Sequence, residues 1–227
     1  MLVKNWMSKN VITVDINEAL IDAIKLLKHN DIGRLPVMKK GEMVGIVTDR
    51  DVKRASASDA VSLEIHELLY LLSKLKIEDF MSKDPITVPP DYTVEETAEV
   101  LLENKISSTP VVDDQDQLVG IITQNDLFRA LISLTGERKK GIQFAFKVED
   151  RPGSTKELAD IIRNYNGRLA SILSSYQNSP KGYRNVYIKA YQIDREKISE
   201  LKNELRGKAT MLYFVDQREN KREVYEL

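Results

Sequence analysis

Hydrophobic and polar positions follow one pattern twice within the first 135 residues. Each copy has a short apolar run (residues 12–14 and 86–88), then apolar residues at i, i+4 and i+7, then two short apolar runs around a polar turn, and last a stretch that begins near an acidic residue. Helical spacing predicts an amphipathic helix, whereas short runs between turn residues predict strands. Each copy is therefore predicted to fold as β-α-β-β-α.

The first helix of each copy carries its hydrophobic stripe at equivalent positions. The two stripes are Leu20, Ile24 and Leu27, and Val94, Ala98 and Leu101. In the second copy, Thr93 and Glu96 have the spacing of a capping box, in which each side chain can bond the backbone N–H of the other residue. We expect this helix to begin directly after Thr93.

The two copies also repeat letter by letter. "WMSKNVITV" (6–14) matches "FMSKDPITV" (80–88) at an offset of 74, and "GIVTDRDV" (45–52) matches "GIITQNDL" (120–127) at an offset of 75. Duplicated units of this size usually bury their cores by pairing about a pseudo-twofold axis, and such pairing brings equivalent loops to face each other across a cleft. The cleft is the expected place for a ligand.

A different pattern follows residue 141. "IQFAFKVE" (142–149) alternates as a strand, "DRPG" (150–153) is a turn, and a helical stripe precedes two further strands, a helix over 194–205 and a last strand at "ATMLYFVD". This order, β-α-β-β-α-β, is that of the ferredoxin-like split βαβ unit. The whole chain is thus predicted to be α/β (α+β), with two repeats followed by a smaller domain.

These patterns divide the chain into predicted segments. They are repeat 1 (1–60), a helical insert (61–78), repeat 2 (79–135), a linker (136–141), the C-terminal domain (142–217) and a charged tail (218–227), expected to be mobile or to form a helix that docks on a partner. The insert has an apolar stripe for which packing on the chain's own core and self-association both stay open. The stripe consists of Ile65, Leu68, Leu69, Leu72 and Leu75.

Composition narrows the function classes. The 227 residues are 42% hydrophobic and 30% charged, with 34 basic and 35 acidic residues, no cysteine, and no apolar run near the roughly 20 residues that a membrane helix needs. The N-terminus lacks the features of a secretory signal. We expect a cytoplasmic protein without disulfides, and we expect neither nucleic acid nor membrane as a partner.

The acidic residues of the duplicated motif are candidates for chemistry. Asp49 and Asp51 could form a catalytic pair, but the second copy has Gln124 and Asp126, so one acid of the pair does not recur. The chain has two histidines and shows no P-loop, no dinucleotide motif and no cluster spaced for a metal. An enzyme, a catalytic cofactor and a metal site are therefore not expected.

Thr-x-x-Asp recurs in both copies, as Thr48 with Asp51 and Thr123 with Asp126. One interpretation is helix capping, in which the hydroxyl bonds a backbone N–H and the acid lies at the positive end of the helix dipole. The other is a ligand site, because a carboxylate can accept bonds from the cis-diol of a ribose, and a hydroxyl with helix N–H groups suits a phosphate.

Positive charge differs between the copies. Arg34 and Arg50 in the first copy correspond to Ser108 and Asn125 in the second. A phosphate is therefore expected to bind more tightly around the first copy, unless these arginines only lie on the surface.

The repeats, with "PVV" on one strand and "G-I-[IV]-T-x-x-D" at a strand-to-helix turn, resemble CBS domains, and the tandem resembles a Bateman module. The resemblance implies two half-sites for AMP, ADP, ATP or another adenosyl compound, and it implies a homodimer. One half-site would contain Ile12, Ile32, Gly33, Arg34, Thr48, Arg50 and Asp51. The other would contain Ile86, Ile106, Ser107, Ser108, Thr123 and Asp126.

Residues 140–217, with the "DRPG" turn, resemble an ACT domain, a small-molecule sensor that often takes amino acids. The resemblance implies a ligand loop at Asp150, Arg151 and Gly153; a plain turn with proline near the helix start is the alternative. The order CBS-CBS-ACT resembles the acetoin utilization protein (AcuB) family, which implies a bacterial protein linked to acetoin or related carbon metabolism.

The sequence thus predicts a non-catalytic regulatory protein. Its CBS pair would bind an adenine nucleotide and signal to a partner that the sequence does not identify. The alternatives are an amino-acid sensor that acts through the ACT domain and a ligand-free oligomeric assembly protein.

Overall fold

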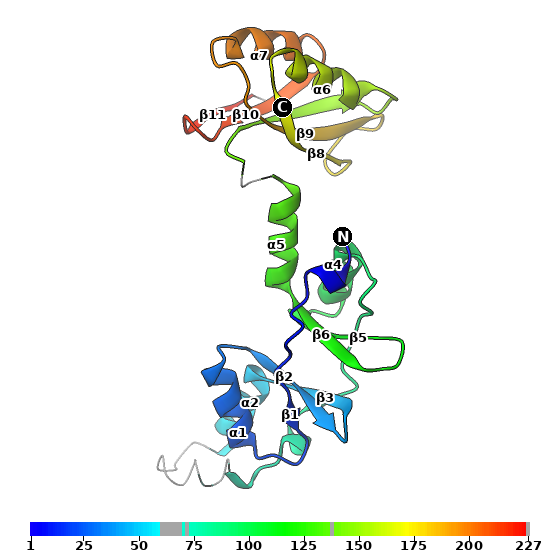
Figure 1. The fold of residues 1–227 in the computed structure, drawn as a ribbon, viewed down its shortest axis with the longest axis vertical. Coiled ribbons are helices and arrows are strands. Elements are labelled where there is room, and N and C mark those ends of the chain that lie inside the picture. The colour runs from blue at the N-terminus through cyan, green and yellow to red at the C-terminus, as the bar shows by residue number, and fades with distance from the viewer. Residues whose placement is uncertain (60–69, 71–72, 137–138, 226–227) are drawn as a thin grey trace. The chain divides into compact units, whose positions relative to one another are not determined.

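The computed structural model describes residues 1–59, 70, 73–136 and 139–225. The chain divides into two compact units, Met1–Ala130 and Leu131–Leu227. The boundary falls inside helix α5 (Gln124–Leu134), a few residues before the predicted linker. Both units mix helices and strands, as the sequence predicts (Figure 1).

The first repeat has the predicted β-α-β-β-α order. Its elements are β1 (Val14–Asp15), α1 (Leu20–His29), β2 (Arg34–Lys39), β3 (Glu42–Thr48) and α2 (Asp49–Asp59). β1 runs parallel to β2, and β2 and β3 form an antiparallel hairpin. Buried residues of α1 (Leu20, Ala23 and Leu27) pack on the sheet, because helical spacing places them on one face.

The second repeat has α4 (Val94–Glu103), β5 (Ser108–Val112), β6 (Leu118–Thr123) and α5. The strand expected at residues 86–88 is reduced to a single parallel bridge between Val88 and Val111. The capping box is confirmed: Thr93 N donates to the Glu96 carboxylate at 2.7 Å, and Glu96 N donates to Thr93 Oγ1 at 3.1 Å.

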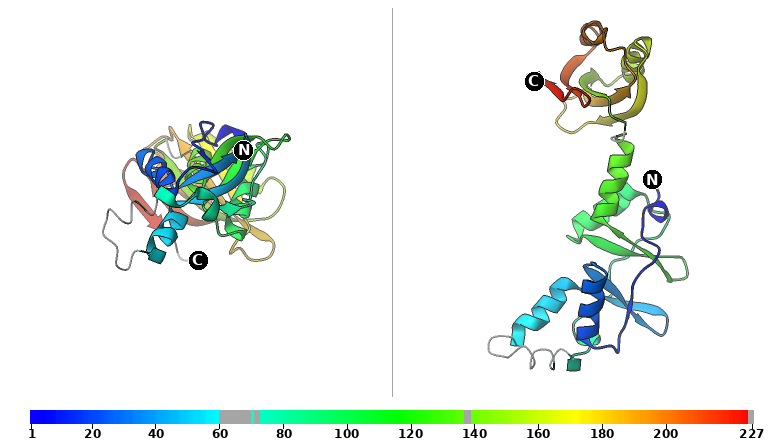
Figure 2. Two further views of the ribbon diagram at one scale, coloured as in Figure 1. Left: turned by 90° about the horizontal axis from the view of Figure 1, so that it is seen from below. Right: turned by 60° about the vertical axis from the view of Figure 1, so that its left-hand side comes forward.

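The segments before β1 and before residue 88 are exchanged between the repeats. The 3-10 helix η1 (Val3–Asn5) belongs to the first copy by sequence, yet Val3 lies in the core of the second repeat. Conversely, η2 (Ile77–Asp79) places Ile77 in the core of the first repeat. The N-terminus accordingly lies beside α4, where Val94 N donates to Met1 O at 2.7 Å (Figures 1 and 2).

Backbone pairing continues this exchange. β4 (Ser82–Lys83) joins β3 of the first repeat and completes the sheet β1-β2-β3-β4, and Ser8 exchanges two backbone hydrogen bonds with Ile121 of β6. The first repeat is thus completed by residues 75–83 and the second by residues 1–8, a division that differs from the contiguous segments of the sequence prediction.

The glycines of the duplicated motif permit this close approach. A Cβ added at Gly45 would lie 2.7 Å from Met81 Sδ and 2.9 Å from the Ser82 carbonyl oxygen, and one added at Gly120 would lie 2.9 Å from Met7 Cγ. A Cβ closer than 3.0 Å forces its neighbour to shift, and at Gly45 one neighbour is backbone, so glycine lets the crossing segment lie against the strand without such a shift.

The C-terminal unit has the predicted β-α-β-β-α-β order. Its elements are β7 (Ile142–Glu149), α6 (Ser154–Asn164), β8 (Arg168–Ser175), β9 (Tyr183–Tyr191), α7 (Ile198–Arg206) and β10 (Thr210–Asp216). The sheet order is β11-β10-β7-β9-β8, with both helices on one face (Figure 1). Phe144, Phe146 and Phe214 pack together under the helices and form the centre of the core.

The prediction of a mobile or helical charged tail is wrong. Residues after Asp216 turn back as β11 (Lys221–Val224), which pairs antiparallel with β10. Asn220 adopts a left-handed conformation in the turn, and Tyr225 packs against the core. The charged residues are accommodated because an edge strand exposes its outer side to water.

The predicted insert lies partly outside the described residues. Ile65, Leu68, Leu69 and Leu72 belong to that portion; Leu75 is described, and it packs against the first repeat's core. Among the helices that the structure describes, none is both long and apolar enough to cross a membrane.

Candidate functional site

The motif threonine and aspartate of the first repeat bond each other at the start of α2. Thr48 N and Thr48 Oγ1 donate to the Asp51 carboxylate at 3.0 and 2.6 Å, and Asp51 N donates to Thr48 Oγ1 at 3.3 Å. Arg54 donates to the other carboxylate oxygen at 3.2 Å. A carboxylate offers about four acceptor positions, so Asp51 retains capacity for a further donor.

The second repeat reproduces this arrangement at the start of α5. Thr123 donates to the Asp126 carboxylate from N at 2.8 Å and from Oγ1 at 2.7 Å, and Arg129 pairs with the other oxygen. Capping is therefore present in both copies. It does not exclude a ligand site, because Thr48, Asp51 and Thr123 also line the two clefts described below.

Arg54 and Arg129, which pair with the motif aspartates, were not predicted as site residues from the sequence. The signal was available, since the motif extends as Thr-x-x-Asp-x-x-Arg in both copies when the comparison is carried three residues further. A residue three positions along a helix lies on the same face, so the arginine reaches the buried carboxylate.

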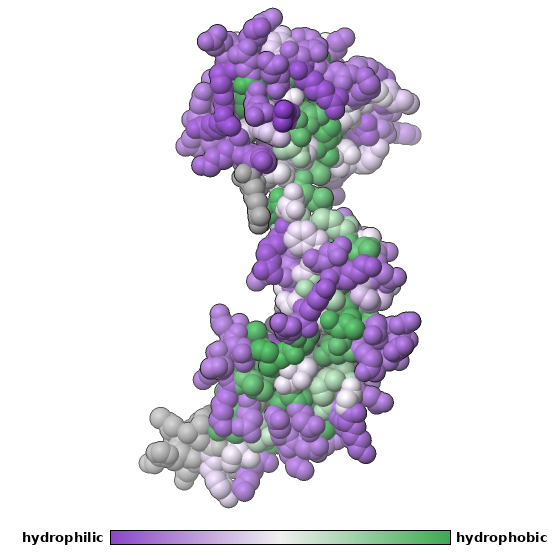
Figure 3. Space-filling view, viewed as in Figure 1, coloured by the Kyte–Doolittle hydropathy of each residue, from purple (hydrophilic) through white to green (hydrophobic). Residues whose placement is uncertain are grey.

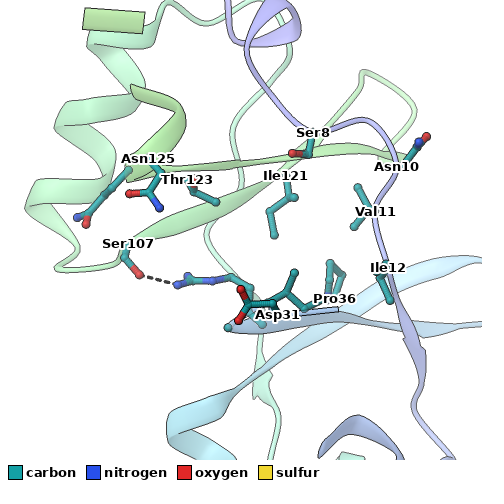
Figure 4. A pocket seen from close by; sticks show the side chains of 14 residues that line it. Ser8, Asn10, Val11, Ile12, Asp31, Pro36, Ser107, Ile121, Thr123 and Asn125 are labelled. Atoms are coloured by element: carbon teal, nitrogen blue, oxygen red, sulfur yellow. Dashed lines mark hydrogen bonds between the residues drawn. The ribbon is translucent and has the colours of Figure 1, made fainter. Parts of the chain in front are cut away.

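One cleft, called cleft A here, has a volume of about 400 Å³. Ser8, Asn10, Val11 and Ile12 come from the crossing N-terminal segment, whereas Thr123 and Asn125 come from the second repeat (Figure 4). The remaining lining residues are Asp31, Ile32, Gly33, Arg34, Pro36, Ser107, Ile121 and Gln124.

A second cleft, cleft B, has a volume of about 420 Å³ and is the counterpart of cleft A under exchange of the repeats. Residues 82–86 of the other crossing segment replace residues 8–12, and Thr48 replaces Thr123. The lining consists of Arg34, Ile46, Thr48, Arg50, Asp51, Arg54, Ser82, Lys83, Asp84, Pro85, Ile86, Ile106, Ser108 and Pro110. On the face shown in Figure 3, hydrophobic surface near β2 lies between hydrophilic areas.

The two clefts group the predicted site residues differently from the two half-sites expected from the sequence. Ile12, Ile32 and Gly33 lie with Thr123, and Ile86 and Ile106 lie with Thr48. Each cleft therefore combines the apolar segment of one repeat with the Thr-x-x-Asp turn of the other. The cause is the strand exchange: residues 8 and 82 pair with the opposite repeat, whereas residues 14 and 88 pair with their own.

The two aspartates are placed differently. Asp51 is 6% exposed and lines cleft B, whereas Asp126 is 1% exposed and is not among the residues that line cleft A. Exposed Asp49 pairs with Lys53 at 2.5 Å and lies in neither lining. The proposed acid pair thus reduces to Asp51 alone.

Charge also differs between the clefts. Four basic side chains line cleft B (Arg34, Arg50, Arg54 and Lys83) against two acids, Asp51 and Asp84; cleft A has Arg34 and Asp31. The excess of basic side chains therefore lies in cleft B, the cleft that contains Thr48.

A buried hydroxyl in cleft B has no hydrogen-bond partner. Ser108 is 3% exposed, its Oγ bonds nothing among the described residues, and the residue lines the cleft. Because an unsatisfied buried hydroxyl costs free energy, a polar ligand atom that bonds it would be stabilised.

The side chains of the predicted ACT ligand loop (150–153) bond other residues of the C-terminal unit. Arg151 forms two hydrogen bonds with Glu157 at 2.7 and 2.9 Å, and Asp150 accepts from Tyr176 at 3.3 Å. This pairing raises the pKa of Arg151 and lowers the pKa of Glu157. Gly153 precedes α6 with φ +88°. A cavity of about 240 Å³ is lined by Arg151 and Glu157 but not by Asp150 or Gly153.

Metal ligands do not gather in the described part of the chain. No group of three or more His, Asp or Glu side chains there is arranged to hold a metal ion.

Comparisons with known proteins identify the family of the two repeats. The family model for the CBS domain matches residues 3–58 and 77–133. An uncharacterized protein of Methanocaldococcus jannaschii, MJ1426, is 34% identical over 155 residues, which cover 58% of this chain and 92% of that protein. The chain belongs to the CBS-domain family. Its two repeats are a CBS pair, as the resemblance implied.

Further relatives show the CBS pair in different settings. A CBS domain-containing protein of Dictyostelium discoideum is 34% identical over 134 residues, 59% of this chain and 92% of that protein. The inosine-5'-monophosphate dehydrogenase of Korarchaeum cryptofilum is 33% identical over 125 residues, 55% of this chain but 23% of that enzyme. The likeness to that enzyme therefore concerns a minor part of it.

A solved structure adds ligand information about another CBS pair. The CBS pair of protein MJ0100, crystallised with 5'-methylthioadenosine and S-adenosyl-L-methionine, is 33% identical, with a TM-score of 0.50 that covers 58% of this chain and 99% of that one. That CBS pair binds adenosyl compounds.

Proposed function

We propose that the CBS pair of this chain binds an adenosyl ligand and that binding regulates a partner protein. The observation that carries the proposal is the pair of equivalent clefts, each lined by isoleucines and by the threonine of a Thr-x-x-Asp turn. Apolar side chains can hold an adenine, and a threonine with a helix N-terminus suits ribose and phosphate. The ligands of the MJ0100 pair support the adenosyl class.

Cleft B is the proposed site for a phosphate-bearing ligand such as AMP, ADP or ATP. Arg50 and Lys83 supply positive charge there, and Asp51 can accept hydrogen bonds from the ribose. The Ser108 hydroxyl supplies a further polar contact. Cleft A, with a balanced lining, suits an adenosyl compound of lower charge.

Calorimetric titration with AMP tests the proposal. Asp51→Ala is expected to lower affinity about tenfold or more, because it removes an acceptor of charge-assisted bonds. The matched control is Asp49→Ala, which changes an exposed acid on the same turn that lies outside both linings. Equal affinity in Asp51→Ala and the wild type would remove the ribose assignment.

The wider role follows from the same proposal. We infer a regulatory rather than catalytic protein that acts in the cytoplasm as a homodimer. The resemblance to the AcuB family connects it with acetoin or related carbon metabolism. Nucleotide hydrolysis by the purified chain would contradict the regulatory role, and a ligand-independent oligomer without nucleotide binding would favour the assembly alternative.

The C-terminal unit is proposed to be an ACT domain with a second ligand. The observations that favour it are the β-α-β-β-α-β order and the left-handed Gly153 before α6. An amino acid that binds there should raise the melting temperature, and Gly153→Ala should abolish the rise. Absence of any shift across the amino acids would leave the unit with a structural role.

A further inference from the structure

Arg34 is common to the linings of both clefts. It is the first residue of β2 in the first repeat, and its guanidinium crosses to the second repeat. Nη2 donates to Ser107 Oγ at 2.5 Å, the bond drawn as a dashed line in Figure 4, and Nη1 donates to the Ser108 carbonyl oxygen at 3.5 Å. One side chain thus lies between two candidate ligand sites.

The guanidinium is half-buried and has neutral partners. Within the described residues no carboxylate forms an ion pair with it, and burial lowers the pKa of Arg34 from its ordinary value. Arginine nevertheless stays charged near neutral pH. A partly desolvated cation without a counter-ion gains more from a nearby anion than an exposed arginine does.

The two clefts depend on Arg34 to different degrees. Cleft B also has Arg50, Arg54 and Lys83, whereas Arg34 is the basic residue in the described lining of cleft A. The planar guanidinium offers its paired donors in one direction. Once it turns toward a phosphate in cleft B, the lining of cleft A is left with Asp31 as its charged side chain.

We propose that Arg34 couples the two clefts, so that an anionic ligand in cleft B weakens the binding of a second anionic ligand in cleft A. The inference rests on the proposed adenosyl function and adds a rule of occupancy to it. Because the coupling acts through charge, a ligand without phosphate in cleft B leaves cleft A unaffected. The chain would then distinguish one bound nucleotide from two.

Calorimetric titrations of the full chain with AMP and with 5'-methylthioadenosine, which has no phosphate, test the coupling. Asp51→Ala weakens the binding of AMP to cleft B, so that cleft A can be titrated while cleft B is largely empty. Cleft A is expected to bind AMP about tenfold more tightly in Asp51→Ala than in the wild type, where cleft B is filled. The affinity of cleft A for 5'-methylthioadenosine should be the same in both proteins.

Arg34→Ser is the decisive variant, because serine stands at the equivalent position of the second repeat, Ser108. In this background, emptying cleft B should leave the AMP affinity of cleft A unchanged. Binding of 5'-methylthioadenosine shows that each variant is folded. Arg34→Ser should also keep the AMP affinity of cleft A as low as in the wild type with cleft B filled, because the basic side chain of cleft A is then missing.

The titrations distinguish a failure of the coupling from a failure of the proposed adenosyl binding. If AMP binds both clefts of the wild type and the affinity of cleft A does not depend on cleft B, the coupling is wrong and the proposed function stands. If the wild type binds one AMP and Asp51→Ala binds none while it still binds 5'-methylthioadenosine, the coupling is likewise wrong. If neither compound binds the wild type, the coupling and the proposed function are both wrong.

Discussion

Asp51 and Asp126 make the same bonds to their threonines and differ in what lies beyond them. Each carboxylate accepts a hydrogen bond from the hydroxyl of the threonine three residues earlier and pairs with the arginine three residues later. Asp51 borders a basic cleft, whereas Asp126 is enclosed. Duplication has thus preserved the cap in both repeats, while the setting gives only one acid access to a ligand.

Substitution of Asp126 tests the capping role at the residue scale. Asp126→Ala should lower the free energy of unfolding by about 1–2 kcal/mol, because the Thr123 N–H and hydroxyl lose their acceptor. Asp126→Asn should recover most of this loss, since an amide oxygen can accept both bonds. Urea denaturation of the two variants measures the difference.

An equal loss in the two variants would contradict the capping explanation and would assign the effect to charge. AMP binding to cleft B should survive both changes, because Asp126 lies outside its lining.

The residue types of the candidate site were predictable because the chain contains its own comparison. The acid that recurs, Asp51, was separated from Asp49 by alignment of the two copies. The burial of Asp126 and the orphan hydroxyl of Ser108 depend on tertiary packing, so no spacing in the sequence reveals them.

The motif glycines allow a prediction at the scale of elements. Gly120→Ala and Gly45→Ala should each cost about 1–3 kcal/mol through overpacking. Met7→Ala should rescue Gly120→Ala, because the atoms nearest the added Cβ belong to the Met7 side chain. Met81→Ala should not fully rescue Gly45→Ala, since the Ser82 carbonyl oxygen stays within 2.9 Å.

Thermal unfolding of the single and double variants measures this asymmetry. Gly33→Ala is the control, because nothing lies within 4 Å of an added Cβ there. Rescue to the same extent in both pairs would show that the backbone contact at Gly45 is relieved in another way.

The β11 hairpin should respond to acid. Glu223 accepts from Lys202 at 2.5 Å and from Tyr225 at 2.5 Å, and these bonds, with that of Lys221, lower the pKa of Glu223 to about 2. Since the carboxylate has a lower pKa in the folded state than its ordinary 4.5, its contribution is present above that value and is lost as the pH falls toward 2.

Melting temperatures of the wild type and Glu223→Gln should therefore differ most above pH 5 and converge toward pH 2. Lys202→Met should show the same convergence, because it removes the main partner of Glu223. A difference that stays constant with pH would exclude this carboxylate as the cause.

Most elements were predictable because their apolar periodicity is local. β11 was not, because its residues are largely charged and it forms only where β10 offers an unpaired edge. β4 has two residues, and its existence depends on a partner strand almost forty positions earlier in the chain.

At the scale of the whole molecule, the exchange of segments means that a substitution in the sequence of one repeat should destabilise the other repeat. Val3 and Ile77 occupy equivalent places at an offset of 74, and both are fully buried. Val3→Ala should loosen the second repeat, and Ile77→Ala should loosen the first by about 2–5 kcal/mol, because each side chain completes the other repeat's core.

Amide hydrogen exchange locates these effects. Val3→Ala should raise exchange in α4, β5 and β6, whereas Ile77→Ala should raise it in α1, β2 and β3. Faster exchange of the first repeat in Val3→Ala would contradict the exchanged arrangement.

The cross-repeat grouping of the clefts was beyond the sequence for a physical reason. Helices, strands and turns are predicted from patterns among neighbouring residues. The pairing of Ser8 with Ile121, in contrast, joins backbone groups more than a hundred positions apart. At both contacts a glycine lies against a methionine, and these two residue types alone do not predict which strand pairs with which segment.

The exchange also fixes an order of events during synthesis. Residues 1–8 are made before their partners beside α4 and on β6, which are among the last parts of the N-terminal unit to be synthesised. The first repeat likewise waits for residues 75–83. Neither half can finish folding before most of the unit has emerged, so long-range closure governs the rate at which the N-terminal unit matures.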